Sequence, residues 1–98
     1  MEEISMAQEL SIVVWAKDGC SYCKDVKEYL TEQNLDYRVI DVTNHDEFRD
    51  ILDIKYGVRH VPVVELGINN QYQGVTEVGI EHLQEALKKV NKVIQQQV

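Results

Sequence analysis

The residues of this chain that are best suited to chemistry are two cysteines, Cys20 and Cys23, with two residues between them. Such a Cys-x-x-Cys pair is typical of sites that open and close a disulfide during thiol exchange. A zinc site would need about four ligands. The histidines, His45, His60 and His82, are scattered and show no ligand spacing. We therefore expect redox chemistry and no metal, with a pair of purely structural cysteines as the alternative.

The segments around the pair indicate which sulfur reacts. Residues 11–16 form an apolar, β-branched run that predicts a buried strand, and residues 20–33 follow a helical pattern. Cys20 would then stand at the helix N-terminus, where unpaired N–H groups and the helix dipole favour a thiolate. Lys17 adds positive charge nearby. We expect Cys20 to be the nucleophile and the more shielded Cys23 to be the resolving thiol.

The remaining elements follow from hydrophobic periodicity and from turn residues. We predict strands at residues 11–16, 37–42, 61–66 and 71–73, a turn at 67–70, and helices at 20–33, 46–56 and 78–94. Thr43 and Asn44 should cap the second helix, Gly57 should end it, and Gly74 should break the last strand. The order β-α-β-α-β-β-α predicts an α/β fold in which a four-stranded mixed sheet carries helices on both faces.

The same periodicity predicts which side chains face the core. Trp15 is expected in the core, and the second helix should turn Phe48, Ile51 and Leu52 inward. The last helix carries an apolar stripe made of Ile80, Leu83, Leu87, Val90 and Ile94. A stripe at helical spacing indicates packing against the sheet rather than a groove for a partner.

Length and charge limit the classes of function. The chain has 98 residues and a formal net charge of −7. We expect one domain over residues 11–98, after an acidic lead-in at residues 1–10. An acidic protein repels phosphate backbones and anionic lipid, which argues against nucleic acid and membrane partners. With no secretory signal and no membrane span in the sequence, we expect a cytoplasmic monomer whose cysteines cycle in a reducing compartment.

Short segments of the sequence resemble the motifs of a known family. Residues 17–23 (Lys-Asp-Gly-Cys-Ser-Tyr-Cys) resemble Lys-x-x-Cys-Pro-Tyr-Cys, and residues 57–62 (Gly-Val-Arg-His-Val-Pro) resemble Gly-x-Arg-Thr-Val-Pro. Residues 73–77 (Gln-Gly-Val-Thr-Glu) resemble Gly-Gly-x-Ser-Asp. These motifs belong to the glutaredoxin family, and the resemblance covers residues 11–93. It implies the thioredoxin fold and a glutathione-dependent oxidoreductase that reduces protein disulfides and glutathione mixed disulfides.

The resemblance also implies a groove that binds glutathione as co-substrate. Carried over, the groove consists of Lys17, Tyr22, Arg49, Arg59, Val61, Pro62, Thr76 and Glu77. The bond before Pro62 would be cis, and main-chain groups of Val61 would pair with the bound peptide. Thr76 and Glu77 would hold the γ-glutamyl end, and the basic residues the glycine carboxylate. As alternatives, the basic residues are solvated surface groups and Glu77 caps the last helix.

Departures from the motifs keep other functions open. Ser21, His60, Gln73 and Glu77 replace the family's Pro, Thr, Gly and Asp. One alternative is a glutaredoxin-like electron donor for ribonucleotide reductase that is itself reduced by thioredoxin reductase. Another, motivated by Ser21, is a dimer that bridges a [2Fe–2S] cluster through Cys20 and glutathione. A third is an adaptor on the thioredoxin fold with an idle cysteine pair.

Overall fold

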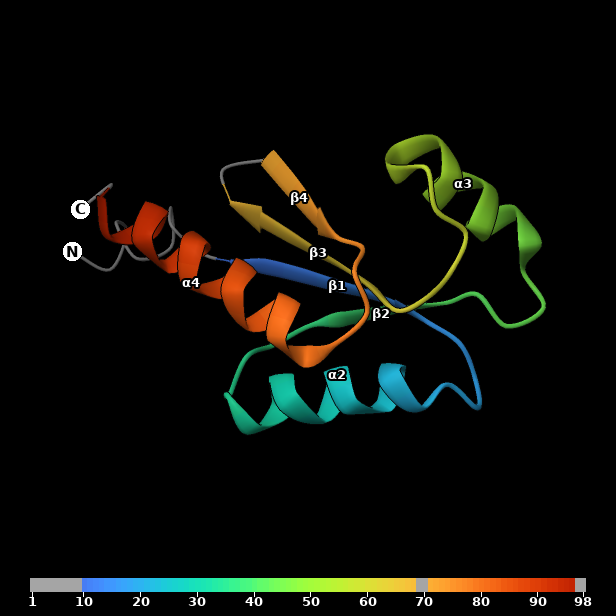
Figure 1. Ribbon diagram of the computed structural model, residues 1–98, viewed down its shortest axis with the longest axis horizontal. Coiled ribbons are helices and arrows are strands. Elements are labelled where there is room, and N and C mark those ends of the chain that lie inside the picture. The colour runs from blue at the N-terminus through green and yellow to red at the C-terminus, as the bar shows by residue number, and fades with distance from the viewer. Residues whose placement is uncertain (1–9, 69–70, 97–98) are drawn as a thin grey trace.

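The helices and strands follow the predicted order β-α-β-α-β-β-α (Figure 1). The computed structural model describes residues 10–68 and 71–96, so the lead-in predicted at residues 1–10 lies almost wholly outside it. The elements are β1 (Ser11–Ala16), α2 (Ser21–Glu32), β2 (Arg38–Asp41), α3 (Asp46–Tyr56), β3 (Val63–Ile68), β4 (Gln71–Val75) and α4 (Ile80–Gln96). The strands form one four-stranded sheet in the order β2-β1-β3-β4. This is the thioredoxin fold, and it confirms the predicted fold class.

Strand β1 lies inside the sheet and is buried on both faces. Ile12, Val14 and Ala16 join an apolar cluster with side chains of α2 and α4. Trp15 points to the opposite face and packs in a second cluster with Leu52 of α3. Successive side chains of a strand point to opposite faces, so one strand serves both clusters. Burying each large apolar side chain contributes about 1.5–3 kcal/mol.

The pairing of the strands fixes where the helices lie. β1 pairs in parallel with β2 and antiparallel with β3, with Val14 between Val39 and Val64. β3 and β4 form an antiparallel hairpin in which Glu65 lies opposite Gly74. In Figure 1, α2 and α4 lie near each other, and α3 is set apart from them. The expected mixed sheet with helices on both faces is therefore confirmed.

The boundaries of α3 are confirmed, but its N-terminal cap is not. Gly57 ends the helix with a left-handed φ of 74°, which a residue without a side chain adopts at little cost. The N-cap position is taken by His45, without a capping side-chain hydrogen bond. Thr43 lies two residues before this N-cap, and its hydroxyl accepts the Asp18 N–H at 2.8 Å instead. Asn44 instead adopts a left-handed φ of 60° in the preceding turn.

One of the inward positions predicted on α3 is also wrong. Leu52 is fully buried and Phe48 packs against the same cluster, as expected. Ile51, by contrast, is 41% exposed. Phe48 and Leu52 are four residues apart and occupy one face of the helix, so their neighbour Ile51 falls at the edge of that face, where solvent reaches it.

The hairpin differs from its prediction at both ends. β3 begins at Val63 rather than at Val61, because Pro62 has no N–H to donate to a sheet. β3 then runs to Ile68, so the turn predicted at 67–70 starts too early, and its residues 69–70 lie outside the described part. Gly74 does not break β4, which continues to Val75. A Cβ on Gly74 would lie 2.5 Å from the Tyr56 ring, so the missing side chain makes room for that ring.

The last helix starts slightly later than the predicted 78–94. It begins at Ile80, directly after Gly79, whose φ is 129°. Leu83, Leu87 and Val90 are buried and Ile80 packs against the same cluster, which confirms this part of the apolar stripe. The side chain of Ile94 lies outside the described part.

A buried carboxylate on β3 connects the sheet with α3. Glu65 is 4% exposed, and its Oε1 accepts a hydrogen bond of 2.8 Å from Trp15 Nε1. Its Oε2 accepts from Lys55 Nζ at 2.8 Å and from the Tyr56 hydroxyl. A buried charge is tolerated when it is paired and hydrogen-bonded in this way. Sequence patterns did not reveal this cluster, because its members lie on three separate elements.

The hydrogen bonds around Glu65 also control its protonation. Burial alone would raise the pKa of the carboxyl, but the bonds from Lys55, Tyr56 and Trp15 outweigh burial, and the pKa lies below its usual value. For Tyr56, burial and the hydrogen bond to Glu65 raise the pKa of the hydroxyl. A carboxyl with a lowered pKa stabilises the fold above its unfolded pKa, and this contribution is lost as the pH falls through the folded value.

We predict that Glu65→Leu lowers the free energy of unfolding by about 2–4 kcal/mol at pH 7, because three donors lose their acceptor. Urea unfolding followed by Trp15 fluorescence measures this change. The control Glu32→Leu, at an exposed position on α2, should change stability by no more than about 0.5 kcal/mol. The difference between wild type and Glu65→Leu should shrink as the pH falls below the ~4.3 of a free Glu carboxyl and Glu65 becomes protonated. Equal effects of both substitutions would contradict the role given to Glu65.

Candidate active site

The cysteine pair lies where β1 passes into α2. After Ala16 the chain makes a turn in which Gly19 has a left-handed φ of 75°, and this turn leads directly to Cys20. Cys20 occupies the N-cap position of α2 in extended conformation, with φ −94° and ψ 111°. Its Sγ accepts a hydrogen bond of 3.1 Å from the backbone N–H of Cys23. The sulfur therefore takes the place that a Ser or Asp oxygen usually occupies at a helix start.

The two sulfurs differ in how far solvent reaches them. They form a disulfide with the Cα atoms 5.2 Å apart. Cys23 is 1% exposed within the apolar cluster, whereas Cys20 is only partly buried at the edge of that cluster. No acidic residue lies in the first turn of α2 to offset the positive end of the helix dipole. The arrangement favours a negative charge on the outer sulfur and shields the inner one.

A second segment, around Pro62, borders the same cluster. The Val61–Pro62 peptide bond is cis, as the resemblance implied. Pro62 is buried, and Val61 packs against the clusters on both sides of the sheet, including the one that contains Cys23. The segment therefore lies between the two cores, at the same end of the sheet as the cysteine pair.

His60 joins this segment to the loop between β4 and α4. Its Nε2 lies 2.7 Å from the carbonyl oxygen of Thr76. Because a carbonyl only accepts, Nε2 must carry the hydrogen and donate it. This hydrogen bond holds Val61 and Pro62 beside Thr76. It therefore brings together the motif segments at residues 57–62 and 73–77. The sequence motifs assign no role to His60, although its place directly before Val61-Pro62, where the family has Thr, could indicate one.

The basic residues of the expected glutathione groove differ in their contacts within the protein. Lys17 is exposed in the turn before Cys20 and Tyr22 is 55% exposed in the first turn of α2, so both flank the pair. The side chain of Arg49 donates instead to the Arg59 carbonyl oxygen at 3.1 Å. Arg59 itself donates to Asp50 of α3 at 2.7 Å. Both guanidinium groups thus hold the loop before Pro62 against α3, which leaves Lys17 as the basic group next to Cys20.

The acidic end of the expected groove has a partner within the protein. Glu77 is exposed, and its Oε1 lies 3.4 Å from Nδ1 of His82 in the first turn of α4. None of the motif segments includes His82. Its spacing from Glu77, across the start of a predicted helix, is the signal that could have found it.

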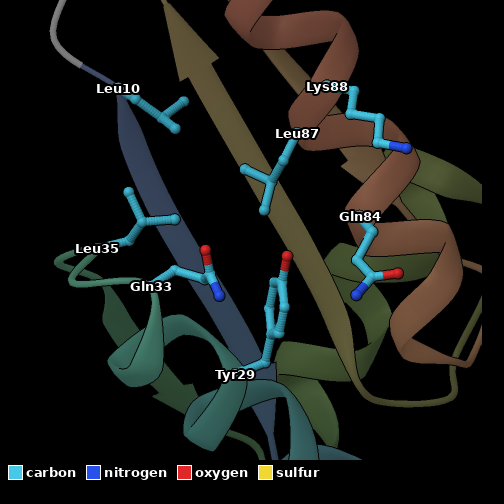
Figure 2. A pocket seen from close by; sticks show the side chains of 7 residues that line it. All are labelled: Leu10, Tyr29, Gln33, Leu35, Gln84, Leu87 and Lys88. Carbon is cyan, nitrogen blue, oxygen red and sulfur yellow. The ribbon is translucent and has the colours of Figure 1, made fainter.

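A pocket at the other end of α2 is separate from these residues. It has a volume of about 470 Å³ and is lined by Leu10, Tyr29, Gln33, Leu35, Gln84, Leu87 and Lys88. Figure 2 shows the Tyr29 hydroxyl directed between the side chains of Gln33 and Gln84. Tyr29 lies nine residues beyond Cys20, roughly 14 Å at a rise of about 1.5 Å per residue. The pocket is therefore not part of the redox site.

Residues 10–68 and 71–96 contain neither a cluster of metal ligands nor a membrane-spanning helix. No group of three or more His, Cys, Asp and Glu side chains in them is placed to hold a metal ion. None of the helices in those ranges combines the length and apolar character needed to span a bilayer.

Comparison with known proteins places the chain among its relatives. The model of the Glutaredoxin family matches residues 12–72. This chain belongs to the glutaredoxin family. A protein of Bacillus subtilis (strain 168) named N-acetyl-S-hydroxy-L-cysteine reductase is 60% identical over 82 residues, which span 84% of this glutaredoxin and 88% of the relative. The protein is accordingly a thiol–disulfide oxidoreductase, and Cys20–Cys23 is its redox-active disulfide.

Solved structures agree with this assignment. The thioredoxin-like protein BC3987 is 31% identical to this glutaredoxin, with a TM-score of 0.59 over 76% of this chain and 96% of the other. A buckwheat glutaredoxin, solved in complex with glutathione, has a TM-score of 0.63 over 98% of this chain and 86% of its own. At 20% identity, the buckwheat protein establishes the shared fold alone.

We predict that reduced Cys20 reacts with iodoacetamide well below the pH at which a free cysteine does. In Cys23→Ser, Cys20 is the one remaining thiol, and its alkylation rate should reach half of its plateau below the ~8.5 of a free cysteine. The physical reason is the hydrogen bond from the N–H of residue 23, together with the dipole of α2. The control is the same variant unfolded in urea. Its alkylation rate should reach half of the plateau at the ~8.5 of a free cysteine. An inflection near that value in the folded variant would remove the argument for a reactive thiolate.

Proposed function

We propose that this glutaredoxin reduces small oxidised cysteine derivatives, with N-acetyl-S-hydroxy-L-cysteine as the model substrate. The observation that carries the proposal is the pair itself: a reachable sulfur at a helix N-terminus with a shielded sulfur behind it. The relative that is 60% identical supports the substrate class, since that protein is named for the reduction of this compound.

The reaction needs two thiols and transfers two electrons. The Cys20 thiolate attacks the substrate sulfur, a Cys20–substrate disulfide forms, and the S–O bond breaks. The departing hydroxide takes a proton and becomes water. Cys23 then loses its proton and attacks Cys20 Sγ, which releases N-acetylcysteine and leaves the Cys20–Cys23 disulfide. The structure contains the pair in this oxidised form, with Cys23 one turn behind Cys20.

A second candidate is the glutathione-dependent activity implied by the sequence motifs. Glutathione would resolve the mixed disulfide or reduce the Cys20–Cys23 pair, and protein disulfides would be further substrates. The bond between His60 and Thr76 favours this candidate, because it brings Val61 and Pro62 next to Thr76 and Glu77. In this proposal Val61 binds the peptide backbone, Tyr22 flanks it, and Lys17 takes a carboxylate. A cytoplasmic location and a monomeric state stay predictions.

We predict different effects for the two cysteines. Cys20→Ser should abolish reduction of N,N′-diacetyl-L-cystine, a stable disulfide that forms the same Cys20–N-acetylcysteine intermediate. Cys23→Ser should still react once and then accumulate that intermediate, which mass spectrometry detects as one added N-acetylcysteinyl group. Ser21→Ala is the control and should retain turnover, because Ser21 supplies no sulfur. Equal loss of the first step in both cysteine variants would contradict these roles. Failure of the wild type to reduce diacetylcystine, with glutathione mixed disulfides still reduced, would favour the second candidate.

The reductant separates the remaining alternatives. We predict turnover with glutathione and glutathione reductase, because a small thiol can reach the partly exposed Cys20. The comparison is turnover with thioredoxin reductase, under the same substrate and protein concentrations. Faster turnover with thioredoxin reductase would instead indicate an electron donor of the ribonucleotide reductase type. Visible absorbance after anaerobic purification would indicate the dimer with a [2Fe–2S] cluster.

A further inference from the structure

The loop between β4 and α4 contains a carboxylate that is paired within the protein. Glu77 Oε1 lies 3.4 Å from His82 Nδ1, and on the other side of the ring His82 Nε2 lies 3.9 Å from Glu81 Oε2. His82 is 38% exposed and Glu77 is 75% exposed. The imidazole therefore stands between two acidic side chains and keeps Glu77 directed toward α4.

This pair adjoins the groove proposed above for glutathione. His60 holds the Thr76 carbonyl next to the segment that contains Val61, and Glu77 directly follows Thr76. Glu77 and His82 also line a small pocket of about 200 Å³, together with Thr76 and two charged residues of α4, Glu85 and Lys89. A substrate attached to Cys20 and lying along Val61 would extend toward this pocket.

Acidic and basic side chains occur in equal number in the lining of this pocket. Glu77 and Glu85 are accompanied by His82 and Lys89. A ligand with a free ammonium gains most from a carboxylate that has no basic partner of its own, and here the His82 imidazole, when protonated, already pairs with Glu77. A ligand whose amino group is acylated has no ammonium and loses nothing.

We infer that His82 is a specificity-determining residue: by holding Glu77, it removes the advantage that a thiol with a free ammonium, such as glutathione, would have over an N-acylated cysteine derivative. This inference rests on the proposed function, since it explains how an N-acetylated substrate can bind as well as one with a free ammonium. His82 acts through Glu77 and touches no reacting atom, so it is a positioning residue.

The test uses two substrates that differ only in the ammonium group. These are the mixed disulfide of glutathione with 2-mercaptoethanol and the same compound with its amino group acetylated. In the full-length wild type the two KM values should agree within about twofold. His82→Ala should lower KM for the ammonium substrate by about two- to fivefold, the size of one exposed ion pair, and leave KM for the acetylated substrate unchanged. His82→Lys restores a cation and should return the KM ratio to that of the wild type.

The matched control is His45→Ala. His45 forms a similar pair with Glu47, with Nδ1 3.1 Å from Oε2, at the start of α3 on the other side of the sheet. Its loss should leave the KM ratio unchanged. The inference would be overturned if His82→Ala had the same ratio of the two KM values as the wild type, or if both KM values changed equally. Failure of the proposed function would give a different result: the wild type would reduce both glutathione substrates but not diacetylcystine.

Discussion

The structure depends on the burial of β1 from both sides. Val14 and its even-numbered neighbours are enclosed by α2 and α4, and Trp15 is enclosed by α3. With apolar surface on both faces, the strand must lie inside the sheet, so β2 and β3 pair on either side of it. A strand fixed in this way ends at a fixed place, and the turn after Ala16 delivers Cys20 to the start of α2.

At that point one atom has two functions. Cys20 Sγ caps α2 by accepting the N–H of Cys23, and the same sulfur is the exposed member of the redox pair. The interaction that begins the helix is therefore also one that stabilises a thiolate. Cys23 is buried in the cluster that α2 forms with the sheet, so its protection from solvent is a result of core packing. Fold stability and redox chemistry share these contacts.

The loops around the pair are held by polar contacts that join distant parts of the chain. His60 fixes the Val61–Pro62 segment to Thr76, and Arg49 and Arg59 fix the start of the same loop to α3. These contacts explain why two arginines that the resemblance assigns to glutathione are engaged elsewhere. Both guanidinium groups are thereby bound within the protein rather than directed at a substrate.

The sequence by itself determined the element order, the two-sided burial of β1 and the place of Cys20 at a helix start, because periodicity and turn residues act over a few neighbouring positions. It also indicated the cis bond before Pro62 through the family motif. Only the tertiary structure decided the cap of α3, the course of β4 through Gly74, the carboxylate cluster of Glu65 and the pairing of Glu77 with His82. Each of these features depends on which distant or solvent-exposed groups come into contact. A local pattern of residue types does not specify such contacts.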